Sequence, residues 1–152
     1  MMALQVFDYR TDIRNVFVSP QIRSRFLRME PGTVAERHSH DLGHEIFLIL
    51  EGRARFEIAG EISDLGPGQM CVARIDEPHQ VSVIGEEPMT MYLSVTPHIQ
   101  PTHTGRDDKD ERKPIRFLPP AAYDQEESRI PVEESIDHFV DLAESLASMA
   151  QT

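Results

Sequence analysis

Short apolar runs separated by glycine and proline turns are the feature that most constrains the fold of this chain. Between Asn15 and Thr96, runs rich in Val, Ile, Phe and Leu alternate with Gly, Pro, Asp and Ser at regular intervals, a pattern typical of short β-strands. The predicted strands are Asn15–Ser19, Ile22–Met29, Glu45–Leu50, Arg53–Ala59, Met70–Ile75, Gln80–Ile84 and Met89–Thr96. Many short strands with Gly/Pro turns between them indicate a β-sandwich or a β-barrel.

The strand predicted over Glu45–Leu50 is apolar on both of its faces. Side chains alternate along a strand, so Phe47 and Ile49 lie on one face, and Ile46 and Leu48 lie on the other. Such a strand must be covered on both sides. A second sheet, the C-terminal segment or a partner subunit could provide this cover.

The character of the sequence changes after Thr96. Residues 1–100 are predicted to form the barrel, with its core at 15–96, and residues 101–130 are a polar, proline-rich arm or loop. Residues 131–150 are predicted to form an amphipathic helix, because Pro131 suits a first helical position and apolar residues recur at helical spacing. The apolar stripe consists of Val132, Ile136, Phe139, Val140, Ala143, Leu146, Ala147 and Ala150. We expect it to pack on the barrel or on a dimer partner.

Composition narrows the function classes. The 152 residues carry a formal net charge of −11 with no compensating basic stripe, so neither nucleic acid nor an anionic membrane is an expected partner. No apolar run approaches the ~20 residues of a membrane span, and the first ten residues do not resemble a secretion signal. Cys71 is the only cysteine, which fits a reducing cytoplasmic setting. A small molecule is the expected ligand.

One segment contains a pattern typical of a metal site. His38 and His40 stand two residues apart on a predicted extended chain, so their side chains point to the same face. Glu45 begins the next strand and can approach them from the side. Adjacent strand residues face opposite ways, so only one of His44 and Glu45 can point inward. Imidazole nitrogens with one carboxylate suit Fe, Mn, Zn, Ni, Co or Cu better than Ca or Mg.

The spacing in this segment resembles the first sequence motif of the cupin superfamily, Gly-x5-His-x-His-x4-Glu-x6-Gly. Gly32, His38, His40, Glu45 and Gly52 match it at every fixed position. The spacing from the carboxylate to the last glycine favours Glu45 over its neighbour. The resemblance implies an all-β fold, the double-stranded β-helix or jelly-roll barrel, here with a C-terminal α-helix, with the metal held inside the barrel.

The second cupin motif is also recognisable, although its turn residues differ. Gly68 and His79 keep the spacing between the motif glycine and the last ligand. Arg74 and Asp76, however, stand where Pro and Gly are usual, and Val83 stands where Asn often closes the motif. The resemblance extends over roughly residues 32–83 and implies that His79 is the fourth ligand.

Taken together, the resemblance implies one divalent transition metal bound by His38, His40, Glu45 and His79. Three neutral imidazoles and one carboxylate leave one or two coordination positions open. Cupins with this ligand set resemble dioxygenases, oxalate-type decarboxylases and isomerases, and some members only bind ligands. The expected function is therefore a metal-dependent enzyme acting on a small oxygen-bearing molecule, with a dioxygenase as the specific expectation. The alternatives are a metabolite-binding or sensing protein and a cupin that has lost its metal.

The sequence assigns no catalytic residue. Tyr92 and Arg55 are candidates beside the metal, each more often a surface or structural residue. His98 and His103 form a second histidine pair in the proline-rich segment. They are read either as exposed loop residues or as part of a cap over the barrel mouth of the same or a neighbouring subunit. Arg74 and Gln80 are further candidates near the metal, and His138 is predicted to be solvated. The two-faced apolar strand, the helix and the arm together suggest a homodimer.

Overall fold

The structure, a computed structural model, describes residues 4–123 and 132–150. The chain divides into two compact units, Met1–Pro119 and Pro120–Thr152. The strands, all in the first unit, are β1 (Asn15–Val18), β2 (Arg23–Met29), β3 (His38–Ser39), β4 (His44–Glu51), β5 (Ala54–Ile58), β6 (Glu61–Leu65), β7 (Met70–Ala73), β8 (His79–Val83), β9 (Met89–Thr96) and β10 (Thr104–Gly105). A 3₁₀ turn, η1 (Pro120–Tyr123), and the helix α1 (Val132–Met149) belong to the second unit.

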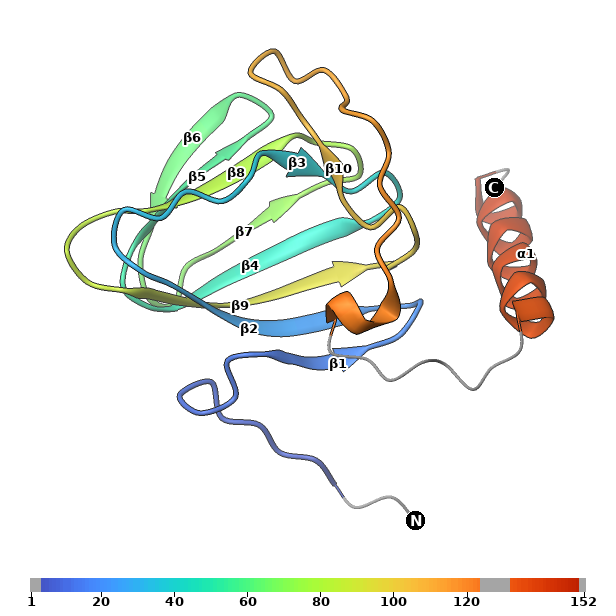
Figure 1. Cartoon of the computed structure of the whole chain (residues 1–152), viewed down its shortest axis with the longest axis horizontal. Helices are drawn as coiled ribbons and strands as arrows, with labels where there is room; N and C mark the ends of the chain where they lie inside the picture. The colour runs from blue at the N-terminus through green and yellow to red at the C-terminus, as the bar shows by residue number, and fades with distance from the viewer. Residues whose placement is uncertain (1–3, 124–131, 151–152) are drawn as a thin grey trace. The chain divides into compact units, whose positions relative to one another are not determined.

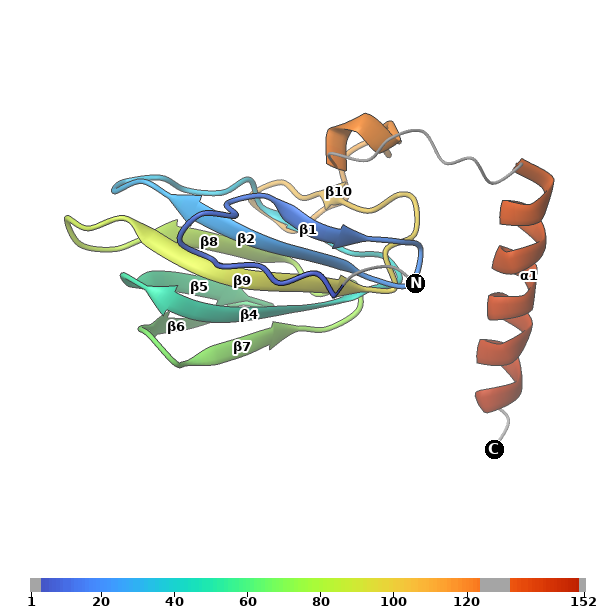
Figure 2. The ribbon, with the colours of Figure 1, turned by 90° about the horizontal axis from the view of Figure 1, so that it is seen from below.

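The strands form two antiparallel five-stranded sheets (Figures 1 and 2). The order is β1-β2-β9-β4-β7 in the first sheet, here sheet A, and β10-β3-β8-β5-β6 in the second, sheet B. The long-range pairings, such as β2 with β9 and β3 with β8, join strands that lie far apart in the sequence. The predicted all-β class, a double-stranded β-helix with a C-terminal helix, is confirmed.

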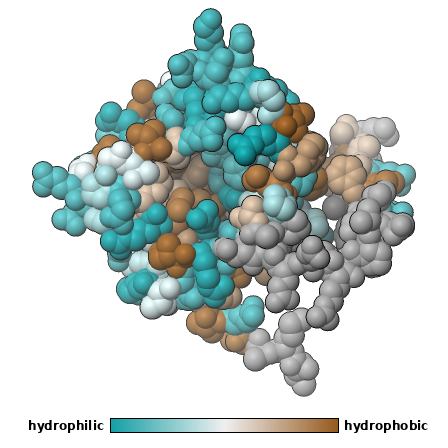
Figure 3. All heavy atoms as spheres, viewed as in Figure 1, coloured by the Kyte–Doolittle hydropathy of each residue, from teal (hydrophilic) through white to brown (hydrophobic). Residues whose placement is uncertain are grey.

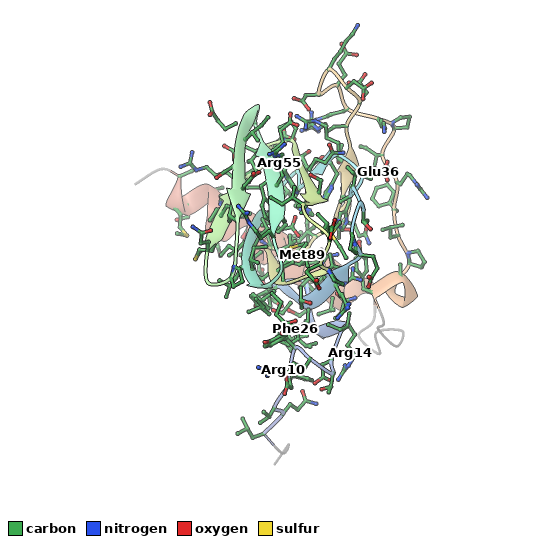
Figure 4. All side chains as sticks on the ribbon, turned by 90° about the vertical axis from the view of Figure 1, so that its left-hand side faces the viewer. Arg10, Arg14, Phe26, Glu36, Arg55 and Met89 are labelled. Atoms are coloured by element: carbon green, nitrogen blue, oxygen red, sulfur yellow. The ribbon has the colours of Figure 1, made fainter. Side chains whose placement is uncertain are left out.

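The hydrophobic core fills the space between the sheets. On β4, Phe47 and Ile49 are 2% and 0% exposed, whereas their neighbours Ile46 and Leu48 are half-buried. This alternation places the first two inside. The Phe47 ring lies 5.0 Å from that of Phe56 on β5, so side chains from the two sheets meet directly. Met89 on β9, labelled in Figure 4, is completely buried in the same cluster.

Three of the observed strands are not among the predicted ones: β3, which lies in a segment predicted only as extended, and then β6 and β10, which lie where no strand is predicted. β6 pairs only with β5 and so forms an edge of sheet B. Four of its five residues are exposed, including Ile62, so it lacks the apolar alternation that identifies a strand. The turn between β5 and β6 indicates this strand better than its own residues do. Ala59 and Gly60 both have positive φ, 48° and 83°, as a two-residue hairpin turn of type I′ requires.

The second strand found where none is predicted, β10, lies within the segment predicted to be an arm. Thr104 and Gly105 pair with Ser39 and His38 of β3, and residues up to Pro119 fold with the barrel unit. Residues 124–130, which complete the predicted arm, lie outside the described residues. Hydrophilic side chains crowd the region above β3 and β10 in the view of Figure 3, where the chain from 106 to 113 runs.

The C-terminal helix forms as predicted over Val132–Met149. Pro131, its expected first residue, lies outside the described residues. The apolar side chains of Phe139, Val140 and Leu146 are 47%, 46% and 59% exposed. Packing of this stripe on the barrel or on a second copy stays a prediction. Among the described residues, α1 is the longest helix, and it is not apolar enough to cross a membrane.

Candidate metal centre

The four side chains that the motifs select converge inside the barrel. One ligand atom from each of His38, His40, Glu45 and His79 lies within 4.8 Å of every other. Strand pairing explains this arrangement, because β3 and β8 place His38 directly opposite His79 in sheet B. Glu45 approaches from β4 in sheet A, 2% exposed, while His44 beside it is exposed. The strand alternation therefore points the carboxylate, and not His44, into the barrel.

Each histidine of the cluster is oriented by a backbone carbonyl. The Nδ1 atoms of His38 and His79 lie 2.9 Å from the carbonyl oxygens of Glu36 and Glu77, two residues earlier in each case. The Nδ1 atom of His40 contacts the carbonyl of Thr102. Because a carbonyl only accepts, each Nδ1 carries the proton and each Nε2 holds a lone pair in the neutral ring.

These Nε2 lone pairs point at the Glu45 carboxylate. Without a positive charge between them, these electron-rich atoms would repel one another. Glu45 Oε2 lies 2.8 Å from His40 Nε2, 3.0 Å from His79 Nε2 and 3.8 Å from His38 Nε2. The buried His38 Nε2 has no hydrogen-bond partner among the described residues. Lone pairs at such distances repel unless a proton or a cation lies between them. Adjacent ligands with bonds of about 2.0–2.2 Å lie roughly 3 Å apart, so the cluster fits a transition metal ion.

Electrostatics favour the protonation states that metal binding needs. Burial alone would raise the pKa of Glu45, but the adjacent His40 and His79 outweigh burial and hold the pKa well below its usual range, so the carboxylate is ionised. Burial, together with the neighbouring His79, lowers the pKa of His38 to about 4. A deprotonated carboxylate and neutral imidazoles are the forms that bind metals.

The structure brings two further polar side chains to the site, Arg23 and His103, that motif spacing did not select. Arg23 on β2 is 4% exposed, and its guanidinium lies 3.6 Å from Glu45 Oε1. The two residues lie in one row of sheet A, since each pairs with Val95 on β9. The ring of His103 lies 4.9 Å from that of His38 and 4.8 Å from that of His40.

The reading of His98 and His103 as exposed loop residues is wrong. His98 is 8% exposed and His103 is half-buried, because their segment returns to the barrel through β10. Burial lowers the pKa of His98 to about 4 and that of His103 to about 2. The other reading, a cap on the barrel of the same subunit, agrees with the ring contacts of His103.

The side chains expected beside the metal lie elsewhere. Tyr92 sits between the buried Met91 and Leu93, so its side chain is on the opposite face of sheet A, where its hydroxyl lies 3.1 Å from that of Ser24. Arg55 is half-exposed and forms a two-bond ion pair with Asp64 on β6.

The remaining two candidates also have structural contacts. The Arg74 side chain is 78% exposed, and the amide of Gln80 donates to the carbonyl of Ala35. Tyr92, Arg55 and Gln80 therefore point away from the cluster, because one position along a strand changes the face. Arg74 lies outside the strands, in the turn that follows β7.

The altered turn of the second motif keeps its backbone shape. Asp76, in place of the usual glycine, adopts a left-handed φ of 61°, a conformation that Asp tolerates better than most residues. Its backbone N–H donates to the carbonyl of His40 at 2.8 Å. Its carboxylate accepts from Arg112 at 2.7 Å and from Arg106. The two motifs therefore remain joined beside the cluster.

Comparisons with known proteins agree with this architecture. Residues 25–96 match the Cupin_2 family, described as a cupin domain. A search of curated proteins found no match. Several solved structures are similar. An uncharacterized protein with a double-stranded β-helix domain from Klebsiella pneumoniae has a TM-score of 0.58 at 19% identity, covering 62% of this chain and 91% of its own.

Two further solved structures resemble the barrel. KdgF from a Halomonas species has a TM-score of 0.53 at 22% identity, covering 58% of this chain and 79% of its own. A sugar phosphate isomerase from Silicibacter pomeroyi has a TM-score of 0.51 at 24% identity, covering 58% and 57%. At these identities the likenesses establish the fold alone. The family match and both motifs placed in the barrel therefore identify residues 25–96 as a cupin domain.

Proposed function

We propose that the protein is a metal-dependent oxidoreductase of the dioxygenase type, acting on a small oxygen-bearing molecule. The observation that carries this proposal is the convergence of three imidazole Nε2 atoms and one carboxylate oxygen, with every Nδ1 already bonded to a carbonyl. A mixed N/O donor set of this kind suits Fe, Mn, Zn, Ni, Co or Cu. A redox-active ion bound there would supply Lewis acidity and electron transfer at positions that four protein ligands leave open.

The charges around the cluster favour a substrate with an ionisable oxygen. Burial keeps His38, His98 and His103 neutral near pH 7, because it lowers their pKa values to about 4 or below. Glu45 and Arg23 carry opposite charges, and their charged groups lie 3.6 Å apart. A divalent ion would leave its charge uncompensated in a buried environment, where an enolate, phenolate or carboxylate oxygen would be stabilised.

A second candidate, a non-catalytic protein that binds or senses a metabolite through the metal, is favoured by the cover over the cluster. The segment that carries His103 covers the cluster next to His38 and His40, and the His103 ring packs against both of their rings. Such a cover suits a ligand that is held rather than turned over.

Elemental analysis tests the metal, and oxygen uptake then separates the two candidates. Untagged protein should retain close to one equivalent of metal after exposure to Fe, Mn, Zn and Ni. His40→Ala should lose it, whereas His44→Ala, an exposed neighbour of Glu45 on the same strand, should retain it. Less than about a tenth of an equivalent in the unmodified protein would refute metal binding.

The dioxygenase proposal expects Fe(II), Mn(II) or Cu(II) to support oxygen consumption with members of a panel of catechols, diketones and flavonols. His44→Ala should behave as the unmodified protein, and His40→Ala should be inactive. Metal that binds stoichiometrically, while no compound in the panel consumes oxygen or changes, would favour the binding protein.

A further inference from the structure

The orientation of His40 depends on a distant part of the chain. His38 and His79 bond to carbonyls two residues earlier, so their own strands orient them. His40 bonds instead to the carbonyl of Thr102, 62 residues later. The segment that follows β9 must therefore be held in place before the third imidazole is directed at the cluster.

Arg106 fastens that segment to the strand that carries the histidines. It is 8% exposed, and its Nε and Nη2 atoms donate to Ser39 Oγ at 2.9 and 2.8 Å. Nη2 also pairs with the Asp76 carboxylate. Ser39 lies between His38 and His40 in sequence, completely buried on the opposite face of the strand. The Arg106 guanidinium thus binds the strand on the face opposite to the one that carries His38 and His40.

Backbone pairing makes this attachment stiff. Thr104 and Gly105 pair with Ser39 and His38, and the Arg106 N–H donates to the Arg37 carbonyl at 2.9 Å. Only one residue separates Thr102 from β10. A shift of the strand at Arg106 would therefore be transmitted to the carbonyl that His40 contacts.

A second arginine in the same region offers a matched comparison. Arg112 donates to Asp76 Oδ2 at 2.7 Å and to Asp41 Oδ2 at 3.1 Å, but its side chain is 47% exposed. Exposed ion pairs contribute little to stability. Hydrogen bonds from a buried guanidinium matter more, because their loss leaves buried partners unsatisfied.

We propose that Arg106 is a positioning residue of the metal centre. By binding Ser39 and Asp76 it holds the Thr102 carbonyl against His40 and so fixes the direction of the His40 Nε2 lone pair. This inference rests on the proposed metal function and adds a requirement to it: the centre needs the segment after β9 as well as the two cupin motifs.

The test is the affinity of the full-length, tag-free protein for Co(II) and Zn(II), measured by competition with a chelator. Arg106→Gln should weaken binding by about 10–100-fold, the effect typical of losing an outer-shell partner. It should also alter the visible absorption of bound Co(II), which reports ligand geometry. Arg112→Gln should weaken binding by less than about 3-fold and leave the Co(II) spectrum unchanged.

Asp76→Gly keeps the inference testable if Arg106→Gln does not fold. Glycine adopts the left-handed turn without strain, so this variant restores the usual motif residue and removes only the carboxylate. We expect a weaker affinity and the same spectral change. Variants that fold, as circular dichroism shows, and bind Co(II) with unchanged affinity and spectrum would overturn the positioning role. Absence of binding in the unmodified protein would overturn the proposed function as well, so the two failures are distinguishable.

Discussion

Replacing Gly52 with alanine should destabilise the protein strongly, whereas the same change at Gly68 should be tolerated. Both glycines are fixed positions of the motifs, and both have positive φ, +70° and +81°. They differ in the space around them. A Cβ at Gly52 would lie 2.8 Å from the Met89 Cα and 3.0 Å from the Pro88 carbonyl carbon, with the Pro88 oxygen closer still. A Cβ at Gly68 would meet nothing within 4 Å.

The magnitudes follow from these contacts. A left-handed backbone costs an L-residue about 1–2 kcal/mol, and the reduced entropy of the unfolded chain returns about 0.4–1 kcal/mol. Gly68→Ala should therefore lower the free energy of unfolding by about 1 kcal/mol. Gly52→Ala adds overpacking of about 1–3 kcal/mol or more, because the neighbours are backbone atoms that cannot rotate away. Its total of about 2–4 kcal/mol is a large part of the roughly 5–15 kcal/mol that stabilises a domain.

Urea unfolding followed by circular dichroism measures both variants against the unmodified protein. The midpoint should fall far more for Gly52→Ala than for Gly68→Ala, with similar m values. A Gly52→Ala protein that does not fold, beside a folded Gly68→Ala protein, agrees with the argument. Variants that differ by less than about 0.5 kcal/mol, or a larger loss at Gly68, would refute it.

Three further outcomes are expected. Metal at about 100 times its dissociation constant should stabilise the protein by about 2.7 kcal/mol, and His79→Ala should abolish the rise in melting temperature, as differential scanning fluorimetry can show. Without metal, stability should be full above about pH 6.5 and fall as the pH drops toward 4. The reason is that burial lowers the pKa of His38 and His98 to about 4 and of His103 to about 2, while the unfolded chain takes up these protons near pH 6.5. Each histidine contributes up to about 1.4 kcal/mol per pH unit, so a flat urea midpoint between pH 7 and 5 would contradict this. Burial also raises the pKa of Cys71 to about 12, so a thiol reagent should label it slowly at pH 8 in the folded protein and rapidly in urea.

Local signals explain how much of the barrel could be predicted from the sequence. Strand alternation and Gly/Pro turns depend on neighbouring residues, so the strands that carry most of the core were predicted within a few residues. The cluster of His38, His40, Glu45 and His79 was predicted through motif spacing, and the structure brings these four together. Their role as ligands stays a prediction until metal is measured.

Two kinds of feature could not be predicted: contacts between residues distant in the sequence, and which face of a strand a side chain lies on. Arg23 reaches Glu45 only because both strands pair with β9, and no sequence spacing records that neighbourhood. Tyr92 was misplaced because β9 is apolar or weakly polar at every position, so the sequence does not reveal which alternate set faces inward. β6 was missed because an exposed edge strand needs no apolar face.

Asp76 shows both a local sequence signal and a contact between distant residues. In the sequence, it is a departure from the second motif, standing where glycine is usual. In the structure, it preserves the left-handed turn, donates its N–H to the His40 carbonyl and adds a carboxylate that glycine lacks. That carboxylate is a partner of Arg106 and Arg112, which both lie beyond the family match at residues 25–96. The residue that differs from the motif, Asp76, is therefore also the residue to which the segment after β9 is attached. A glycine there would form the same turn without the attachment, which is why Asp76→Gly separates the fold of the second motif from the positioning of His40.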